Sequence, residues 1–158
     1  MTDFPELLGA LTRHQVAFIV VGGAAAIAHG STRLTQDLDI VYERSTANLD
    51  RLVAALANFQ PYLRGAPRGL PFLWERLTLE RGLNFTLVTS LGDVDLLGEI
   101  PGGGGYSDLL PGTVEIQLFQ TRCRCLSLEQ LIRAKRAAGR PRDLEALAEL
   151  EAIDEEGS

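Results

Sequence analysis

The segment GGAAAIAHGSTRLTQDLDIV, residues 22–41, combines a glycine pair with two aspartates one residue apart. A short apolar run before the glycines predicts a buried strand. Asp37 and Asp39 begin a second apolar run, which predicts a strand whose period of two places both carboxylates on one face. Between these strands, Gly22 and Gly23 let the backbone turn sharply and approach a phosphate at the start of a helix.

Two carboxylates this close repel each other unless a cation lies between them. Carboxylate oxygens are preferred ligands of Mg²⁺ and Mn²⁺, which keep several waters and take substrate phosphates as further ligands. The aspartate pair and the glycine pair therefore predict a metal site beside a phosphate site. The alternative interpretation is an exposed strand end with two solvated acids.

Composition indicates one globular domain over residues 1–158, with 46% hydrophobic and 23% charged residues. No apolar run approaches the ~20 residues that span a bilayer, and the N-terminus lacks the pattern of a signal peptide, so we expect a cytoplasmic protein that contacts no membrane. The net charge of −6 argues against a nucleic-acid binder with a broad basic surface. Cys123 and Cys125 share one strand face and are expected to be reduced thiols.

Periodicity and turn residues predict an α+β order of elements. Phe4 and Leu11 belong to a first amphipathic helix, and Thr46 caps a helix that follows the aspartate strand. Residues 59–81 have three prolines and no clear period, which predicts a loop with one or two short strands. We further expect strands over 83–89, 93–97, 114–118 and 122–126, a flexible glycine-rich loop over 101–112, and C-terminal helices over 127–153 with Leu144, Leu147 and Ala148 facing inward.

A third carboxylate lies in another predicted strand. Asp95 is flanked by Val94 and Leu96, and a strand beside residues 37–41 would bring it against the other two aspartates. Asp93 faces the same side and is the alternative third acid. Three carboxylates can hold two divalent ions roughly 4 Å apart.

The only lysine, Lys135, falls within the apolar stripe of a C-terminal helix, seven residues after Leu128. Ser127 and Gln130 form a capping box that opens this helix. The lysine therefore either points into a cleft or packs its stem while the ammonium reaches solvent. His29, at the end of the helix after the glycine pair, is expected to be a structural cap.

The ordered set of a glycine pair, a D-x-D and a separate third aspartate resembles the DNA polymerase beta-like nucleotidyltransferase superfamily. The string GGAAAIAHGSTRLTQDLDI, with Arg33 and Thr35 ahead of the D-x-D, resembles the bacterial minimal and AbiEii-like branch of that superfamily. One position departs from the pattern. Many members carry serine where this chain has Gly23, so backbone amides alone would contact the phosphate there.

The C-terminal stretch LEQLIRAKRAAGRPRDLEALAEL resembles the same branch, with Lys135, Arg140 and Asp143 at family-like positions. The resemblance runs from about residue 16 to residue 150 and leaves 59–81 unmatched. It implies a two-layer α+β nucleotidyltransferase fold, with a small mixed sheet, helices mainly on one face and a C-terminal helical pair.

The resemblance also implies an activity: metal-dependent transfer of a nucleoside monophosphate from an NTP such as ATP to a hydroxyl of an RNA (a tRNA-like end) or of a protein. The chain could belong to a bacterial toxin–antitoxin pair and bind its partner protein. The alternative is a catalytically silent binding protein or antitoxin of the same fold.

The resemblance assigns roles to individual residues as well. Two Mg²⁺ or Mn²⁺ ions would be held by the catalytic acids Asp37, Asp39 and Asp95. Arg33 has a second possible role as counterion of Asp37 or Asp39 in the metal-free chain. The nucleotide would be bound by Gly22, Gly23, Arg33, Thr35 and Lys135.

Overall fold

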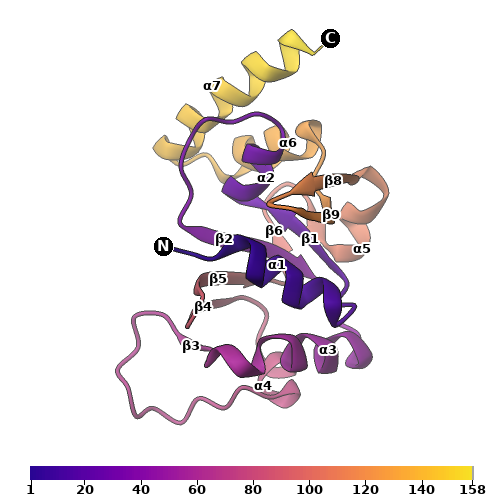
Figure 1. The fold of residues 1–158 in the computed structure, drawn as a ribbon. Helices are drawn as coiled ribbons and strands as arrows, with labels where there is room; N and C mark the ends of the chain where they lie inside the picture. The colour runs from indigo at the N-terminus through magenta and orange to yellow at the C-terminus, as the bar shows by residue number, and fades with distance from the viewer. Residues whose placement is uncertain (158) are drawn as a thin grey trace.

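The computed structural model describes residues 1–157 and contains a mixed β-sheet with helices packed around it (Figure 1). Ser158, the last residue of the predicted domain, lies outside the described residues. The strands are β1 (Phe18–Val21), β2 (Asp37–Tyr42), β3 (Tyr62–Leu63), β4 (Phe85–Thr89), β5 (Gly92–Leu97), β6 (Glu99–Ile100), β7 (Gly104–Gly105), β8 (Val114–Leu118) and β9 (Thr121–Cys125). The seven-stranded sheet has the order β3-β4-β5-β2-β1-β9-β8, and β6 pairs with β7 separately.

The helices alternate with these strands along the chain. They are α1 (Phe4–Arg13), α2 (Gly22–Ala28), α3 (Thr46–Leu56), α4 (Arg76–Arg81), α5 (Tyr106–Leu109), α6 (Leu128–Ala138) and α7 (Pro141–Glu156), with 3₁₀ turns over Ala57–Phe59 and Leu110–Gly112. A mixed sheet with helices confirms the predicted fold class. No helix within residues 1–157 is both long enough and apolar enough to cross a membrane.

The helix caps agree with those predicted from the sequence, except at the start of α3. Ser127 and Gln130 form the predicted capping box of α6. Helix α3 is capped by Ser45 and not by Thr46 as predicted. Ser45 has extended backbone angles, and its hydroxyl accepts a hydrogen bond from the Asn48 amide, so Thr46 is already the first helical residue.

The centre of the sheet consists of β1 and β2, which run antiparallel, and of β5, which runs parallel to β2. Strands β4 and β5, both predicted, pair antiparallel as a hairpin. The parallel pairing of β2 with β5 requires a long crossover, which includes α3, α4, β3 and β4. Strands distant in sequence therefore lie side by side at the middle of the sheet.

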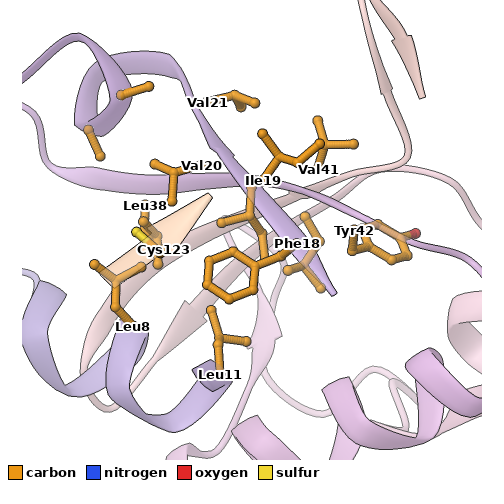
Figure 2. Packing of buried hydrophobic residues seen from close by; sticks show 14 of the residues in the cluster. Leu8, Leu11, Phe18, Ile19, Val20, Val21, Leu38, Val41, Tyr42 and Cys123 are labelled. Carbon is orange, nitrogen blue, oxygen red and sulfur yellow. The ribbon is translucent and has the colours of Figure 1, made fainter. Parts of the chain in front are cut away.

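The core contains buried residues of the sheet and of helices α1 and α3, and helices α2 and α6 also contribute to it. Figure 2 shows Leu8 and Leu11 of α1 pointing toward the sheet, with Leu11 near Phe18 of β1. All four residues of β1 are buried, as expected for a central strand covered on both faces. Cys123, on β9, belongs to the same cluster.

One buried polar side chain ties α3 to the sheet. Asn48 is 0% exposed, accepts a hydrogen bond from the Ala17 amide at 2.7 Å and donates to the carbonyls of Ala17 and Glu43. Its amide therefore bonds the Ala17 amide and the Glu43 carbonyl beside the start of β1 and shares the Ala17 carbonyl with the Glu43 amide.

Residues 59–81 contain more structure than predicted. Besides the short strand β3, they include helix α4, which is anchored by the buried Leu79. Trp74 donates its ring N–H to the Val53 carbonyl and packs against the core, so this aromatic residue fixes a segment without sequence periodicity. The glycine-rich segment 101–112, predicted to be a flexible loop, contains β7, α5 and a 3₁₀ turn.

The C-terminal helices form the predicted pair, with an ion pair of 2.8 Å between Arg136 and Glu151, and α7 extends beyond the sheet in Figure 1. The predicted inward stripe of α7 is wrong at Leu144, whose exposed fraction is 53%, and at Ala148, which is also exposed, whereas Leu147 is partly buried against the core. Asp143 and Leu150 are the buried residues of α7 instead. The helix is held at its start by charged hydrogen bonds to Asp143, so it does not need an apolar residue at position 144.

Candidate active site

Four aspartates from β2 and β5 lie on one face of the sheet. The parallel register places Asp37 beside Asp93 and Asp39 beside Asp95, and the period of two points all four carboxylates the same way. The residues between them, among which Leu38 and Val94 pair directly, are fully buried on the opposite face. We call Asp37, Asp39, Asp93 and Asp95 the carboxylate ledge.

Three carboxylates of the ledge converge. Asp37, Asp39 and Asp95 each offer an oxygen atom, and these oxygens all lie within 4.8 Å of one another. Asp93, the alternative third acid, pairs with Asp37 at the start of β5 and is not part of this group. The donor set contains only carboxylate oxygens, which is the set that hard divalent cations such as Mg²⁺ and Mn²⁺ prefer.

The electrostatics of the ledge favour an added cation. Burial, followed by the neighbouring Asp95 carboxylate, raises the pKa of Asp39 to about 7. Burial and Asp95 also raise the pKa of Asp37. One oxygen of Asp39, Oδ1, is buried and has no hydrogen-bond partner among residues 1–157. A divalent ion would supply that partner and relieve the repulsion, so the residues fit a metal.

Arg64 partly supplies this positive charge. Its Nη2 lies 2.8 Å from Asp95 Oδ1, its Nε lies 3.4 Å from Asp93 Oδ2, and its Nη1 lies 3.8 Å from Asp37 Oδ2. Sequence reasoning missed Arg64 because segment 59–81 has no period that places its side chains. The signal that could have found it is chemical: several acids on adjacent strands require a counterion.

Arg33, which was the candidate counterion, does not have this role. Its guanidinium pairs with Glu145 of α7 at 3.8 Å. The loop that carries Arg33 is held to α7 by Glu149, which accepts hydrogen bonds from Ser31 and Thr32. This loop therefore turns Arg33 toward α7, and Arg64 pairs with the aspartates instead.

The glycine pair makes room for the side chains of the site itself. Gly22 has a φ of 64°, and a Cβ there would collide with the Asp39 carboxylate. A Cβ on Gly23 would lie 2.6 Å from Thr35 Oγ1. The two glycines therefore let the start of α2 approach Asp39 and Thr35 closely.

A cavity of about 470 Å³ opens over the ledge, and both acidic and basic side chains line it. We call its basic residues on α6 and around the start of α7, Lys135, Arg140 and Arg142, the basic wall. Asp143, whose side chain is 1% exposed, accepts hydrogen bonds from Arg140 Nε at 2.6 Å and from Lys135 Nζ at 3.4 Å. The first of these bonds holds the pKa of Asp143 below its usual value. The charged residues that line the cavity are Arg33, Asp37, Asp39, Asp95, Lys135, Arg140, Arg142, Asp143 and Glu149.

One histidine and two cysteines that the sequence analysis considered have structural roles. His29 is the C-cap of α2, and its Nε2 lies 2.7 Å from the Leu126 carbonyl, which confirms the predicted cap. Cys123 and Cys125 are unpaired and buried, and burial raises their thiol pKa values to about 11 and about 12. These thiols are protonated core groups and do not belong to the cavity.

Comparisons with known proteins identify the fold. No protein-family model matches the sequence, and no curated protein sequence matches it. Among solved structures, the lincosamide antibiotic adenylyltransferase LnuA, bound to lincomycin, superposes with a TM-score of 0.61 at 16% identity over 96% of this chain and 98% of that chain. A proposed nucleotidyltransferase of Thermotoga maritima superposes with a TM-score of 0.59 at 16% identity over 94% of each chain. The chain therefore has a nucleotidyltransferase fold.

Proposed function

We propose that this chain is a metal-dependent nucleotidyltransferase that moves a nucleoside monophosphate from an NTP to an acceptor hydroxyl. The observation that carries the proposal is the single cavity in which Asp37, Asp39 and Asp95 face Lys135. The carboxylates offer a divalent-metal site, and the basic wall offers charge to a polyphosphate. The fold shared with two proteins described as nucleotidyltransferases supports the same activity.

The carboxylates Asp37, Asp39 and Asp95 would hold Mg²⁺ or Mn²⁺, two ions in our proposal, which neutralise phosphate charge and lower the pKa of a bound hydroxyl. The acceptor oxygen attacks the α-phosphorus, the bond to the bridging oxygen breaks, and pyrophosphate leaves with the electron pair. Asp95 takes the acceptor proton. Lys135 stabilises the charge that develops on the leaving pyrophosphate.

The remaining nucleotide contacts come from the loop and the glycine turn. Gly22 and Gly23 let the backbone approach the triphosphate, Thr35 offers a hydroxyl, and Arg33 offers a guanidinium that is half exposed in its pair with Glu145. A single guanidinium–carboxylate pair at this exposure contributes less than about 1 kcal/mol, so a phosphate can replace Glu145 as its partner.

The acceptor is proposed to be a hydroxyl of an RNA, such as a tRNA end, or of a protein, in a chain of the bacterial AbiEii-like branch that acts in the cytoplasm within a toxin–antitoxin pair. The likeness to LnuA adds a small hydroxylated molecule as a further acceptor class. The rival function is a silent binding protein of the same fold. The presence of all three converging carboxylates favours the enzyme.

Transfer of label from α-labelled NTPs tests the proposal. Each NTP is incubated with Mg²⁺ and cell extract, with wild type, Asp39→Asn and the control Asp154→Asn, which removes an exposed carboxylate of α7. RNA, protein and small molecules are then separated. We expect label in one fraction for wild type and the control and none for Asp39→Asn.

Label that persists in Asp39→Asn would refute the proposed site. Titration calorimetry with each NTP and Mg²⁺ or Mn²⁺ separates the enzyme from a silent fold. An absence of heat with every nucleotide would refute the enzyme proposal.

A further inference from the structure

Arg64 contacts three of the four carboxylates of the ledge, as described above. The shortest contact, 2.8 Å, is with Asp95, which is one of the three converging carboxylates. The pair with Asp37, at 3.8 Å, involves a second member of that group. The guanidinium therefore binds the same carboxylates that a divalent ion would bind.

The backbone of Arg64 is fixed while its side chain has room to leave. The Arg64 amide donates to the Thr86 carbonyl at 2.9 Å, which continues the pairing of β3 with β4. The next residue, Gly65, has a φ of 79° and open space around it, so the chain leaves the sheet there. The side chain is 28% exposed, so rotation about its own bonds is enough to carry the guanidinium into solvent.

The hydrogen bonding of the guanidinium is incomplete. Its Nη2 donates to Asp95 and to the Leu87 carbonyl, at 2.8 and 2.7 Å. Its Nε is buried and makes no hydrogen bond among the described residues, although Asp93 lies 3.4 Å away. Arg64 thus neutralises part of the ledge without satisfying all of its own donors or the buried Oδ1 of Asp39.

We propose that Arg64 is a built-in counterion that competes with the divalent metal and so sets the metal affinity of the ledge. The inference rests on the proposed function, since it takes the ledge to be a metal site. In the metal-free chain, Arg64 lowers the repulsion among four like charges. A divalent ion brings twice the charge of the guanidinium to the same carboxylates and repels it, so binding includes the free energy of breaking the Arg64–Asp95 pair.

Metal affinity tests the proposal without an activity assay. Binding of Mn²⁺ is measured by electron paramagnetic resonance for wild type, Arg64→Gln, Arg64→Lys and Arg68→Gln. The last is the matched control, because Arg68 lies in the same loop but places its guanidinium over the Tyr62 ring, 4.7 Å from the ring centre. Asp39→Asn identifies the ions bound at the ledge.

We expect Arg64→Gln to bind Mn²⁺ about tenfold more tightly than wild type, as follows from losing one charged hydrogen bond. Arg64→Lys, which keeps the positive charge on a compact ammonium without the planar fork of donors, should fall between them, and Arg68→Gln should match wild type. In EDTA, Arg64→Gln should have a lower melting temperature than wild type and a larger rise on adding Mn²⁺.

Equal or weaker Mn²⁺ binding by Arg64→Gln would overturn the proposal. If that variant does not fold without metal, equal affinities of Arg64→Lys and wild type overturn it instead. Absence of ledge-bound Mn²⁺ in every protein would overturn both this proposal and the metal site. Tight Mn²⁺ binding without label transfer would overturn the proposed function alone.

Discussion

Replacing Asp39 with asparagine should make the metal-free chain more stable. The wild-type carboxylate is largely buried, and its pKa is raised to about 7 first by burial and then by the nearby Asp95 carboxylate. Above that pH, the ionised Asp39 carboxylate therefore lowers the stability of the folded state. An asparagine keeps the shape of the side chain, removes the charge and can donate a hydrogen bond to Asp95.

The magnitude follows from the pKa. One pKa unit corresponds to 1.36 kcal/mol, so moving the pKa from 3.8 to about 7 bounds the cost of ionising Asp39 in the folded chain at about 4 kcal/mol. Lys135 already offsets part of that cost. We expect a gain of about 1–3 kcal/mol in the free energy of unfolding at pH 8.

The raised pKa of Asp39 determines the direction in which the stability of wild type changes with pH. A carboxyl whose folded pKa is raised binds its proton more tightly in the folded chain, so the stability of wild type falls between pH ~4 and pH ~7 and is level above. At pH 5, Asp39 is protonated in the folded chain. The gain of Asp39→Asn should therefore be less than half of its value at pH 8.

Urea unfolding in EDTA at pH 8 and pH 5 checks this prediction. Asp93→Asn is the control, because it changes a carboxylate of the same ledge outside the converging group. That change should alter the free energy of unfolding by less than about 1 kcal/mol. An Asp39→Asn chain no more stable than wild type at pH 8 would refute the reasoning, and a gain that does not shrink at pH 5 would refute its electrostatic origin.

Three further substitutions test contacts within the site and the attachment of α3 to the sheet. Asp143→Asn should cost about 2 kcal/mol of unfolding free energy, because it weakens a buried charged hydrogen bond to Arg140; a loss independent of pH between 2 and 7 would contradict this. Asn48→Ala should lower the free energy of unfolding measured in urea by about 3 kcal/mol, since it removes three part-buried hydrogen bonds to the backbone, and a cost below about 1 kcal/mol would contradict it. Gly22→Ala, with its collision against Asp39 and its φ of 64°, should cost about 2 kcal/mol and weaken Mn²⁺ binding; unchanged affinity would contradict that contact.

Much of the candidate site could be predicted because its acids lie in strands with clear alternation. Asp37 and Asp39 share a face by geometry alone, and apolar neighbours on both sides place Asp95 within a strand. The pairing of β2 with β5 then follows from the need to bury residues such as Leu38. For Lys135, which falls within an apolar helical stripe, the sequence left two alternatives, a side chain in a cleft or a packed stem with a solvated ammonium, and the residue lines the cavity.

The parts that could not be predicted depend on contacts between distant segments. Arg64 directly follows the two-residue strand β3, and no local sequence pattern shows that its side chain points at the ledge. Helix α4 has only one buried residue, Leu79, so its apolar stripe is too short to be recognised. Leu144 follows helical spacing but is exposed, because hydrogen bonds to Asp143 fix the start of α7.

The parallel pairing of β2 with β5 has a consequence for the order of folding. Asp39 and Asp95 meet only after the whole crossover between these strands has closed, and closing a long loop precedes any gain from the contacts that it brings. The carboxylates oppose this closure, while the buried pair Leu38 and Val94 on the other face favours it. Arg64 belongs to the same crossover and arrives together with β5, so the cation reaches the acids in the step that brings them together.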